Sequence, residues 1–230
     1  TADASSIGAT SATLGGNVTS DGGDAVTDRG VVYKAGSGVT ISDNKTQIGS
    51  GTGEFGQSIG SLSVNTHYYF RAYATNTVGA TLGSELDFWT LAAVPEAPIV
   101  GNPTETSLDI TLDADSNPAG TEYAIQRTSD SKYLQDDGTW GDTAVWQTTN
   151  NWDTITAGDL TPATTYYFQV KARNGANVET AFGDTGSGTT EESGAPVRWT
   201  TLVHQGTPVY TYYLGDELLY QFQYAINTDT

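Results

Sequence analysis

The side chains best suited to nucleophilic or acid–base catalysis are two histidines, His67 and His204, in a chain of 230 residues with no cysteine. A nucleophilic triad needs a base such as histidine, held against a nucleophile and oriented by a carboxylate. His67 opens a segment of strand-like alternation and His204 falls in an expected hairpin loop, so both histidines fit structural positions. Carboxylates number 27, so that no single pair is distinctive. The sequence therefore predicts no catalytic residues and no enzyme.

Oxygen ligands at calcium-loop spacing occur once, in Asp113-Ala-Asp115-Ser-Asn117. A calcium loop of the helix–loop–helix type requires glycine at its sixth position and a bidentate glutamate at its twelfth. Pro118 and Ala124 stand there instead, which excludes such a loop. A looser calcium site at a domain junction remains a candidate, drawing on Asp113 and Asp115 or on Asp21 and Asp24. No other cofactor is expected.

A flat carbohydrate site would need exposed aromatic rings, and three tryptophans lie close together at Trp140, Trp146 and Trp152. Trp146 and Trp152 fit core or strand-edge positions, as large aromatics in sandwiches usually do. Trp140 lies in a turn-like segment, Asp137-Gly-Thr-Trp-Gly-Asp142, and is the candidate glycan contact. Packing of Trp140 in the core is the competing interpretation.

The composition limits the partners of the chain. With 9 basic and 27 acidic residues, the net charge of −18 opposes nucleic-acid binding, which depends on basic side chains against phosphates. No apolar run approaches the roughly 20 residues that cross a bilayer as a helix. Abundant Gly and Tyr beside few charged residues favour strands and turns, so the composition predicts an all-β protein held by packing alone.

An internal repeat sets the domain organisation. Residues 62–76 match residues 160–174 at an offset of 98, which is about the length of one sandwich domain. In each copy a turn precedes a long alternating segment, with Tyr68, Phe70, Ala72 and Ala74 predicted to face inward in the first copy. Tyr166, Phe168, Val170 and Ala172 take the same positions in the second.

The segment Leu160-Thr-Pro-Ala-Thr-Thr-Tyr166 resembles the turn before a long strand in fibronectin type III domains. In that family a tyrosine makes the corner of a Greek-key sandwich, and the resemblance gives this role to Tyr68 and Tyr166. The first copy departs from the family pattern at Val64, where proline is usual.

The resemblance implies an all-β chain of two tandem Greek-key β-sandwiches, fibronectin type III or immunoglobulin-like, of the kind found in bacterial secreted or cell-surface proteins. We expect one sandwich at 1–92, a proline-containing linker at 93–98, a second sandwich at 99–190 and a strand-rich C-terminal segment at 191–230.

The C-terminal segment predicts three short strands, the last with Leu218, Tyr220, Phe222 and Tyr224 alternating along one apolar face. A meander of this size cannot bury enough apolar area alone. It is the start of a third domain, a segment that docks on the second domain, or a strand donor that pairs with another molecule.

Two functions follow as hypotheses. The first is a non-catalytic extracellular structural or adhesive surface protein, joined head to tail into a filament or to other surface proteins through its C-terminal strands. The second is an accessory spacer or carbohydrate-binding region of a larger secreted polysaccharide-acting enzyme, for which Trp140 would supply the glycan contact.

Overall fold

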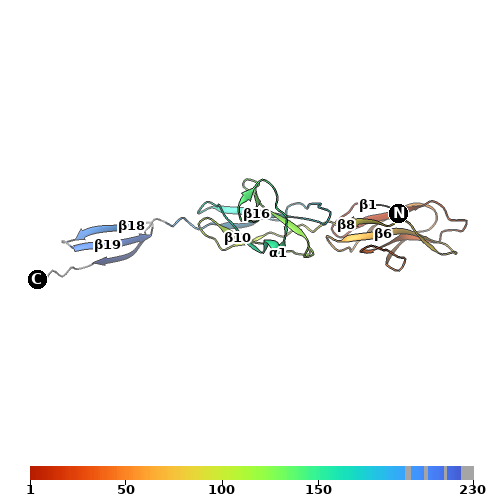
Figure 1. Ribbon diagram of the computed structural model, residues 1–230, viewed down its shortest axis with the longest axis horizontal. Coiled ribbons are helices and arrows are strands. Elements are labelled where there is room, and N and C mark those ends of the chain that lie inside the picture. Colours follow the sequence, from red (N-terminus) through yellow and green to blue (C-terminus); the bar gives the residue numbers. More distant parts are fainter. Residues whose placement is uncertain (195–197, 205–206, 215–216, 224–230) are drawn as a thin grey trace.

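The computed structural model describes residues 1–194 in full, together with the backbone of 198–204, 207–214 and 217–223. Residues 1–194 form two β-sandwiches placed end to end, with β6 in one and β16 in the other (Figure 1). The fold is all-β apart from one short helix, α1 (Thr149–Trp152). In the described part of the chain, no helix has the length and apolar character needed to cross a membrane.

The first sandwich packs a sheet of order β1-β2-β5 against a sheet of order β4-β3-β6-β7, in which β8 also pairs with β6. All neighbours are antiparallel. The strands are β1 (Ala2–Ser5), β2 (Ala12–Val18), β3 (Asp28–Ala35), β4 (Asn44–Gly49), β5 (Gly53–Ile59), β6 (His67–Thr75), β7 (Ala80–Leu82) and β8 (Leu86–Trp89).

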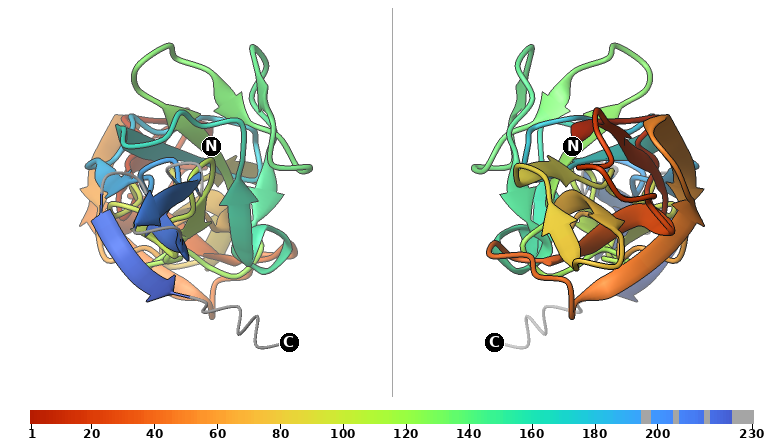
Figure 2. Two further views of the ribbon diagram at one scale, coloured as in Figure 1. Left: turned by 90° about the vertical axis from the view of Figure 1, so that its left-hand side faces the viewer. Right: turned by 90° about the vertical axis from the view of Figure 1, so that its right-hand side faces the viewer.

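The second sandwich packs a sheet of order β15-β10-β9 against a sheet of order β13-β12-β11-β16-β17, with β14 also pairing with β11. Seen along the long axis, the strands of the two sandwiches overlap, and two loops of the second sandwich project beyond the outline (Figure 2). The strands are β9 (Ile99–Gly101), β10 (Leu108–Thr111), β11 (Glu122–Arg127), β12 (Tyr133–Leu134), β13 (Trp140–Gly141), β14 (Gln147–Thr148), β15 (Thr154–Ala157), β16 (Thr165–Arg173) and β17 (Gly186–Thr189).

Each sandwich has its own core, and the alternation of the long strands fills it. Phe70 in β6 and Phe168 in β16 are fully buried, as their inward positions in the sequence predict. One residue crosses the expected domain boundary. Ala92, the last residue of the range expected for the first sandwich, packs with the core of the second.

The outer face of the first sandwich departs from the predicted alternation. Ala74 was expected inward and Tyr73 outward, yet Tyr73 is 2% exposed and Ala74 is only half-buried. Tyr73 packs with Val32 beneath Val39, which belongs to the loop between β3 and β4. The Glu85 carboxylate fixes this loop by accepting the backbone N–H groups of Gly38 and Val39. The loop thus covers a strand face that the alternation alone would leave in solvent.

The two sandwiches share one turn in atomic detail. The Tyr68 hydroxyl accepts the backbone N–H of Ser63 at 3.0 Å, and the Tyr166 hydroxyl accepts that of Thr161 at 2.9 Å. A buried threonine closes each turn. In the first sandwich, Thr90 Oγ1 accepts the Thr66 N–H at 2.9 Å and donates to the Ser63 carbonyl. In the second, Thr190 Oγ1 accepts the Thr164 N–H and donates to the Thr161 carbonyl.

At the tip of this turn the backbone is left-handed in both sandwiches. Asn65 has φ 41° in the first sandwich and Ala163 has φ 50° at the equivalent position in the second. Asparagine tolerates this conformation better than alanine does.

The C-terminal segment contains β18 (Arg198–His204), β19 (Thr207–Leu214) and β20 (Glu217–Gln223). They form an antiparallel sheet of their own in the order β18-β19-β20. The expectation of three strands agrees with this backbone. Tyr224 lies outside the described residues.

Candidate functional site

His67 is engaged in packing and in one hydrogen bond to a carboxylate. Its ring stacks on Trp89 with centroids 4.8 Å apart and touches Tyr69 at 4.5 Å. His67 Nε2 lies 2.8 Å from Asp87 Oδ2, and the Asp87 side chain is 56% exposed. The ring therefore joins β6 to β8 on the surface. His204 is the last residue of β18, and its side chain lies outside the described part of the chain.

The calcium candidates lie at two ends of the molecule. Asp113 Oδ1 accepts the backbone N–H of Asp115 at 2.9 Å in a loop beside the second sandwich's contact with the first. Asp21 and Asp24 lie at the opposite end of the first sandwich, so the expectation that they belong to the junction is wrong. Two hydrogen bonds from Thr77 lower the pKa of the Asp24 carboxyl. Within residues 1–194, no three acidic or histidine side chains gather as a metal site would require; Asp113 and Asp115 remain a prediction.

Trp140 is packed, which corrects its interpretation as an exposed turn residue. It belongs to β13, rests against the second core and stacks on Phe168 with centroids 5.7 Å apart. Its indole N–H donates to the Gly158 carbonyl at 2.9 Å, and the Arg127 guanidinium lies 4.3 Å from its ring centroid. These contacts hold the ring against the core, on a hairpin of β12 and β13 that extends the sheet beyond β11. The geometry therefore argues against Trp140 as a glycan platform.

The junction between the sandwiches is joined by side-chain amides. Asn65 Nδ2 donates to Thr121 Oγ1 at 2.7 Å, and Asn65 Oδ1 accepts the Gly175 N–H at 2.9 Å. Asn174 Nδ2 donates across the junction to the Thr90 carbonyl at 3.0 Å. Asn65, Thr121 and Asn174 are all buried. Buried amides cost free energy when they lose their partners, so these bonds favour one orientation of the two sandwiches.

Asn117 secures the chain between the sandwiches. Its Oδ1 accepts the Ala93 N–H at 2.8 Å and its Nδ2 donates to the Ala93 carbonyl at 3.1 Å. Both backbone groups of Ala93 are thus satisfied by one side chain of the second sandwich, much as a neighbouring strand would satisfy them.

The Trp89 ring of the first sandwich lies against Gly175 of the second. A Cβ added at Gly175 would lie 2.3 to 2.6 Å from three ring carbons of Trp89, so only glycine allows this approach. The expected linker packs closely against the second sandwich, and its Pro95 and Pro98 are buried. A Cβ added at Gly183 would lie 1.9 Å from the Pro95 carbonyl oxygen, and one added at Gly186 would lie 2.0 Å from that of Pro98. The linker is therefore packed onto the second sandwich.

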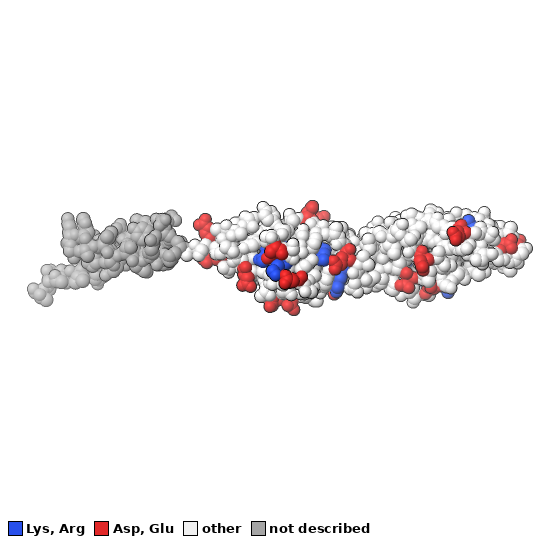
Figure 3. Space-filling view, turned by 90° about the horizontal axis from the view of Figure 1, so that it is seen from above, with Lys and Arg blue, Asp and Glu red and all other residues white. Residues whose placement is uncertain are grey.

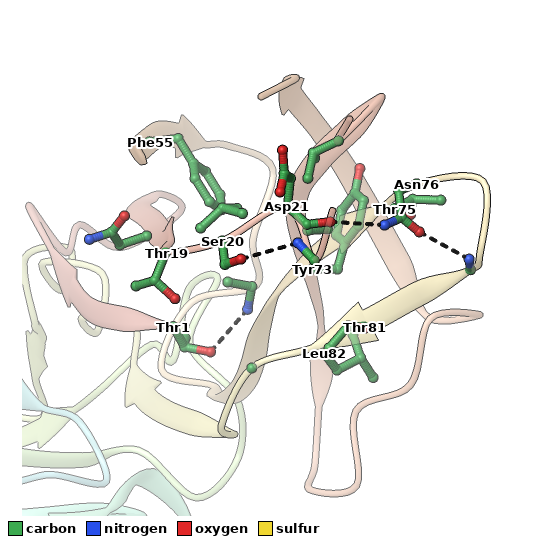
Figure 4. Close-up of a pocket in the computed structure, with 18 residues that line it drawn as sticks. Thr1, Thr19, Ser20, Asp21, Phe55, Tyr73, Thr75, Asn76, Thr81 and Leu82 are labelled. Atoms are coloured by element: carbon green, nitrogen blue, oxygen red, sulfur yellow. Dashed lines mark hydrogen bonds between the residues drawn. The ribbon is translucent and has the colours of Figure 1, made fainter. Parts of the chain in front are cut away.

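A cleft opens at the end of the first sandwich that lies farthest from the junction (Figure 4). It encloses about 380 Å³ between the end of β2 on one side and β7 on the other. Asn17 and Val18 line the β2 side, and Thr81 and Leu82 line the β7 side. Tyr73 lies between them, and Phe55 of β5 lines the cleft on the far side of Thr19. Thr1 lies at the cleft border, where its Oγ1 accepts the Ala72 N–H at 3.1 Å.

The basic side chains of the second sandwich are all engaged in ion pairs. Its four basic side chains are each paired with a carboxylate, and Figure 3 shows basic groups beside acidic ones on the face in view. The pairs are Arg127–Asp130, Lys132–Asp142, Lys171–Glu179 and Arg173–Glu122. Lys171 also lies near the rings of Tyr133, Trp146 and Phe182. This surface is poorly suited to an anionic ligand.

Solved structures with the same architecture identify the fold. A two-domain fibronectin type III segment of chicken tenascin superposes with a TM-score of 0.52 at 13% identity, over 82% of this chain and 97% of that one. The fold is that of tandem fibronectin type III domains. The FN1–FN3 domains of chicken CNTN1 also match, at 17% identity and a TM-score of 0.36, over 94% of this chain and 74% of that one. No protein-family model matches the sequence, and no curated protein proved similar to it.

The sequence did not single out the residues that join the two fibronectin type III-like domains for this role. Asn65 and Asn174 look like ordinary turn residues, since asparagine is common in turns, and Asn117 drew attention only as an oxygen ligand of the calcium-loop pattern. The one available signal was the exchange of Asn65 for Ala163 between two otherwise matching turns.

Proposed function

We propose that this chain is a non-catalytic structural spacer of an extracellular surface assembly, in which two fibronectin type III-like domains act as one stiff rod. The observation that supports the proposal is the junction, where buried amides of Asn65 and Asn174 bond across the two domains. Domains joined only by a mobile linker would need no such bonds. A spacer that sets a distance between its two ends requires them.

The second part of the proposal concerns the end of the rod. The strands β18, β19 and β20 form a sheet whose outer strands, β18 and β20, each pair on one side only within the described backbone. Unpaired strand edges add further strands readily. We infer that this sheet connects the spacer to a neighbouring molecule, and a connection of this kind between unlike surfaces builds a filament when it does not close.

Stiffness of the junction is measurable because the chain contains no cysteine. Spin labels on Ser58→Cys and Ser187→Cys, both exposed strand positions, report the distance between the two domains by double electron–electron resonance. A stiff rod gives one narrow distance distribution. Asn65→Gly removes the bridging amide while keeping the left-handed turn, and we expect it to broaden the distribution.

The control is Asn102→Gly, because Asn102 also has a positive φ of 45° and its side-chain amide donates to Asp109 at the far end of the second domain. The control should leave the distribution narrow. A broad distribution in the unaltered chain would refute the spacer proposal outright.

The connection is tested by light scattering and electron microscopy of the full chain beside a chain ending at Ser193. Both domains have their own cores within residues 1–193, so the shorter chain keeps its rod. Regular assemblies from the full chain alone support the connection, and two monomeric rods refute it.

A further inference from the structure

The sequence contains one Asn-Gly pair, Asn174-Gly175, and the junction between the domains is built around it. The pair directly follows β16, and Asn174 is 4% exposed. Asn174 Nδ2 donates to the Thr90 carbonyl, and the Gly175 N–H donates to Asn65 Oδ1. Both hydrogen bonds run from the second domain to the first, so both depend on how the domains are docked.

An Asn-Gly pair is chemically reactive. The backbone nitrogen of the glycine attacks Cγ of the asparagine side chain, and glycine hinders this attack least because it has no Cβ. The N–Cγ bond forms as the Cγ–Nδ2 bond breaks, and ammonia leaves with Nδ2 and the proton that the glycine nitrogen gives up. Water then opens the succinimide ring and leaves either aspartate or isoaspartate.

We propose that Asn174 is a deamidation site that is protected while the two domains are docked, and that its reaction loosens the joint irreversibly. The inference rests on the stiff joint proposed above and adds a one-way chemical route from a stiff rod to a hinged one. Solvent water is the only co-reactant.

Docking restrains both reacting groups. The Gly175 N–H is bonded to Asn65 Oδ1, which keeps its proton from solvent while that bond lasts. The Asn174 side chain is fixed at both polar atoms, because Oδ1 accepts the N–H groups of Ala176 and Val178 at 3.1 and 2.8 Å while Nδ2 bonds the first domain. Undocking removes the bonds to Asn65 and Thr90 and frees both groups.

Solvent reaches the pair as soon as the joint opens. Gly175 is exposed, and together with Asn174 and Asn177 it lines a hollow of about 260 Å³ beside the junction. The observed deamidation rate is then the rate of the free turn multiplied by the fraction of undocked molecules, as for any reaction that requires local opening. Deamidation of Asn174 therefore reports how often the joint opens.

The products cannot rebuild the joint. Aspartate has no side-chain N–H, so the Thr90 carbonyl loses this donor and faces a carboxylate in a buried site. Isoaspartate lengthens the main chain by one carbon before Gly175. That residue packs so closely on Trp89 that an added Cβ would lie 2.3 to 2.6 Å from three ring carbons, which leaves no room for the longer chain.

The test follows deamidation in the full chain, incubated in mildly alkaline buffer, by the mass gain of the proteolytic peptide that contains residue 174. The same chain unfolded in guanidinium chloride gives the rate of the unprotected pair. We expect the folded chain to react at least about tenfold more slowly, because the reaction waits for undocking. Isomerisation at Asp21-Gly22 or Asp137-Gly138 changes no mass and does not contribute.

A matched pair of variants assigns the protection to the joint. Asn65→Gly removes the acceptor of the Gly175 N–H, and we expect it to speed deamidation of the folded chain about tenfold, as the loss of a buried hydrogen-bond partner predicts. Asn102→Gly alters another left-handed asparagine, far from the junction, and should leave the rate unchanged.

The effect on the joint is measured on the product. The deamidated chain carries one more negative charge, so ion exchange separates it from the unreacted chain, and labels at Ser58→Cys and Ser187→Cys report its interdomain distance. We expect a broad distribution from this product and from Asn174→Asp. Asn177→Asp adds the same charge at an exposed position of the same turn and should keep the distribution narrow.

Three results would overturn the proposal. They are equal rates in the folded and unfolded chain, no greater acceleration by Asn65→Gly than by Asn102→Gly, and a narrow distribution after deamidation. An unprotected Asn174 in a chain with a narrow distribution refutes this inference and leaves the spacer proposal standing. A broad distribution in the unaltered chain refutes both.

Discussion

One added methyl group at Gly175 tests whether the two domains are held at a fixed angle. In Gly175→Ala the new Cβ would lie 2.3, 2.5 and 2.6 Å from three carbons of the Trp89 ring. Carbon atoms in favourable contact are about 3.5 to 4.0 Å apart, so either the ring or the loop that carries residue 175 must move by about 1 Å. Trp89 also stacks on His67, so movement of the ring disturbs a second contact.

The cost follows from the contacts that are lost. Overpacking in a well-filled site costs about 1 to 3 kcal/mol. Displacing residue 175 also breaks the N–H bond to Asn65, which contributes about 1 kcal/mol. The docking free energy of the two domains should fall by about 2 to 4 kcal/mol, which multiplies the undocked population about 30- to 700-fold at 1.4 kcal/mol per factor of ten.

The assay is the distance between labels at Ser58→Cys and Ser187→Cys, combined with urea unfolding. We expect Gly175→Ala to broaden the distance distribution and to separate the unfolding of the two domains. Gly101→Ala is the control, because a Cβ there meets no atom within 4 Å and the backbone has no positive φ. If Gly175→Ala gives the same narrow distribution and the same midpoint as Gly101→Ala, the claim that the Trp89 contact fixes the junction is wrong.

Three further changes test the turns and the covering loop. Thr190→Val removes the hydroxyl that accepts the Thr164 N–H at 3.0 Å, and should lower the free energy of unfolding of the second domain by about 1 to 3 kcal/mol in urea titrations, since a buried donor loses its partner. Ala163→Gly relieves a left-handed alanine at φ 50° and should raise that free energy by up to about 1 kcal/mol; no gain would show that the turn carries no strain. Glu85→Gln tests the loop over Tyr73, because backbone N–H bonds from the loop lower the pKa of the Glu85 carboxyl below 4.5. A lowered pKa means that the stabilisation is present above pH 4.5 and is lost as the pH falls through the folded-state value, so urea midpoints of the variant and the unaltered chain should differ above pH 4.5 and converge in acid.

The long strands and the fold class could be predicted because they rest on local alternation. Phe70 and Phe168 occupy inward positions of β6 and β16, and the period of two alone assigns them to the core. Tyr68 and Tyr166 are the second residues of β6 and β16, directly after the turn, so their positions follow from the sequence.

Contacts made by loops could not be predicted in this way. Tyr73 is buried only because a distant loop lies over it, and Trp140 is packed because the hairpin of β12 and β13 places its ring against Phe168 in the core. Between β13 and β15, only Gln147–Thr148 is extended, and the chain then turns into α1, where Trp152 is buried. These outcomes depend on long-range packing, which overrides local propensity.

The hydrogen bonds at the junction between the domains could not be predicted for a related reason. Asn65, Asn117 and Asn174 act between domains, and a single domain's pattern gives no reason to distinguish them from turn residues.

The equivalent turn residues Asn65 and Ala163 differ in how they can attach each domain to the segment that follows it. At the tip of the first turn, the side-chain amide of Asn65 hydrogen-bonds to the next domain. At the tip of the second turn stands Ala163, whose methyl group has no donor or acceptor to offer to whatever follows Glu191. Asn65 is therefore one of the side chains that resist bending at the first joint, and Ala163 cannot take this role at the second. An Ala163→Asn substitution, paired with a suitable acceptor in the following segment, would be the natural way to add a second stiff joint.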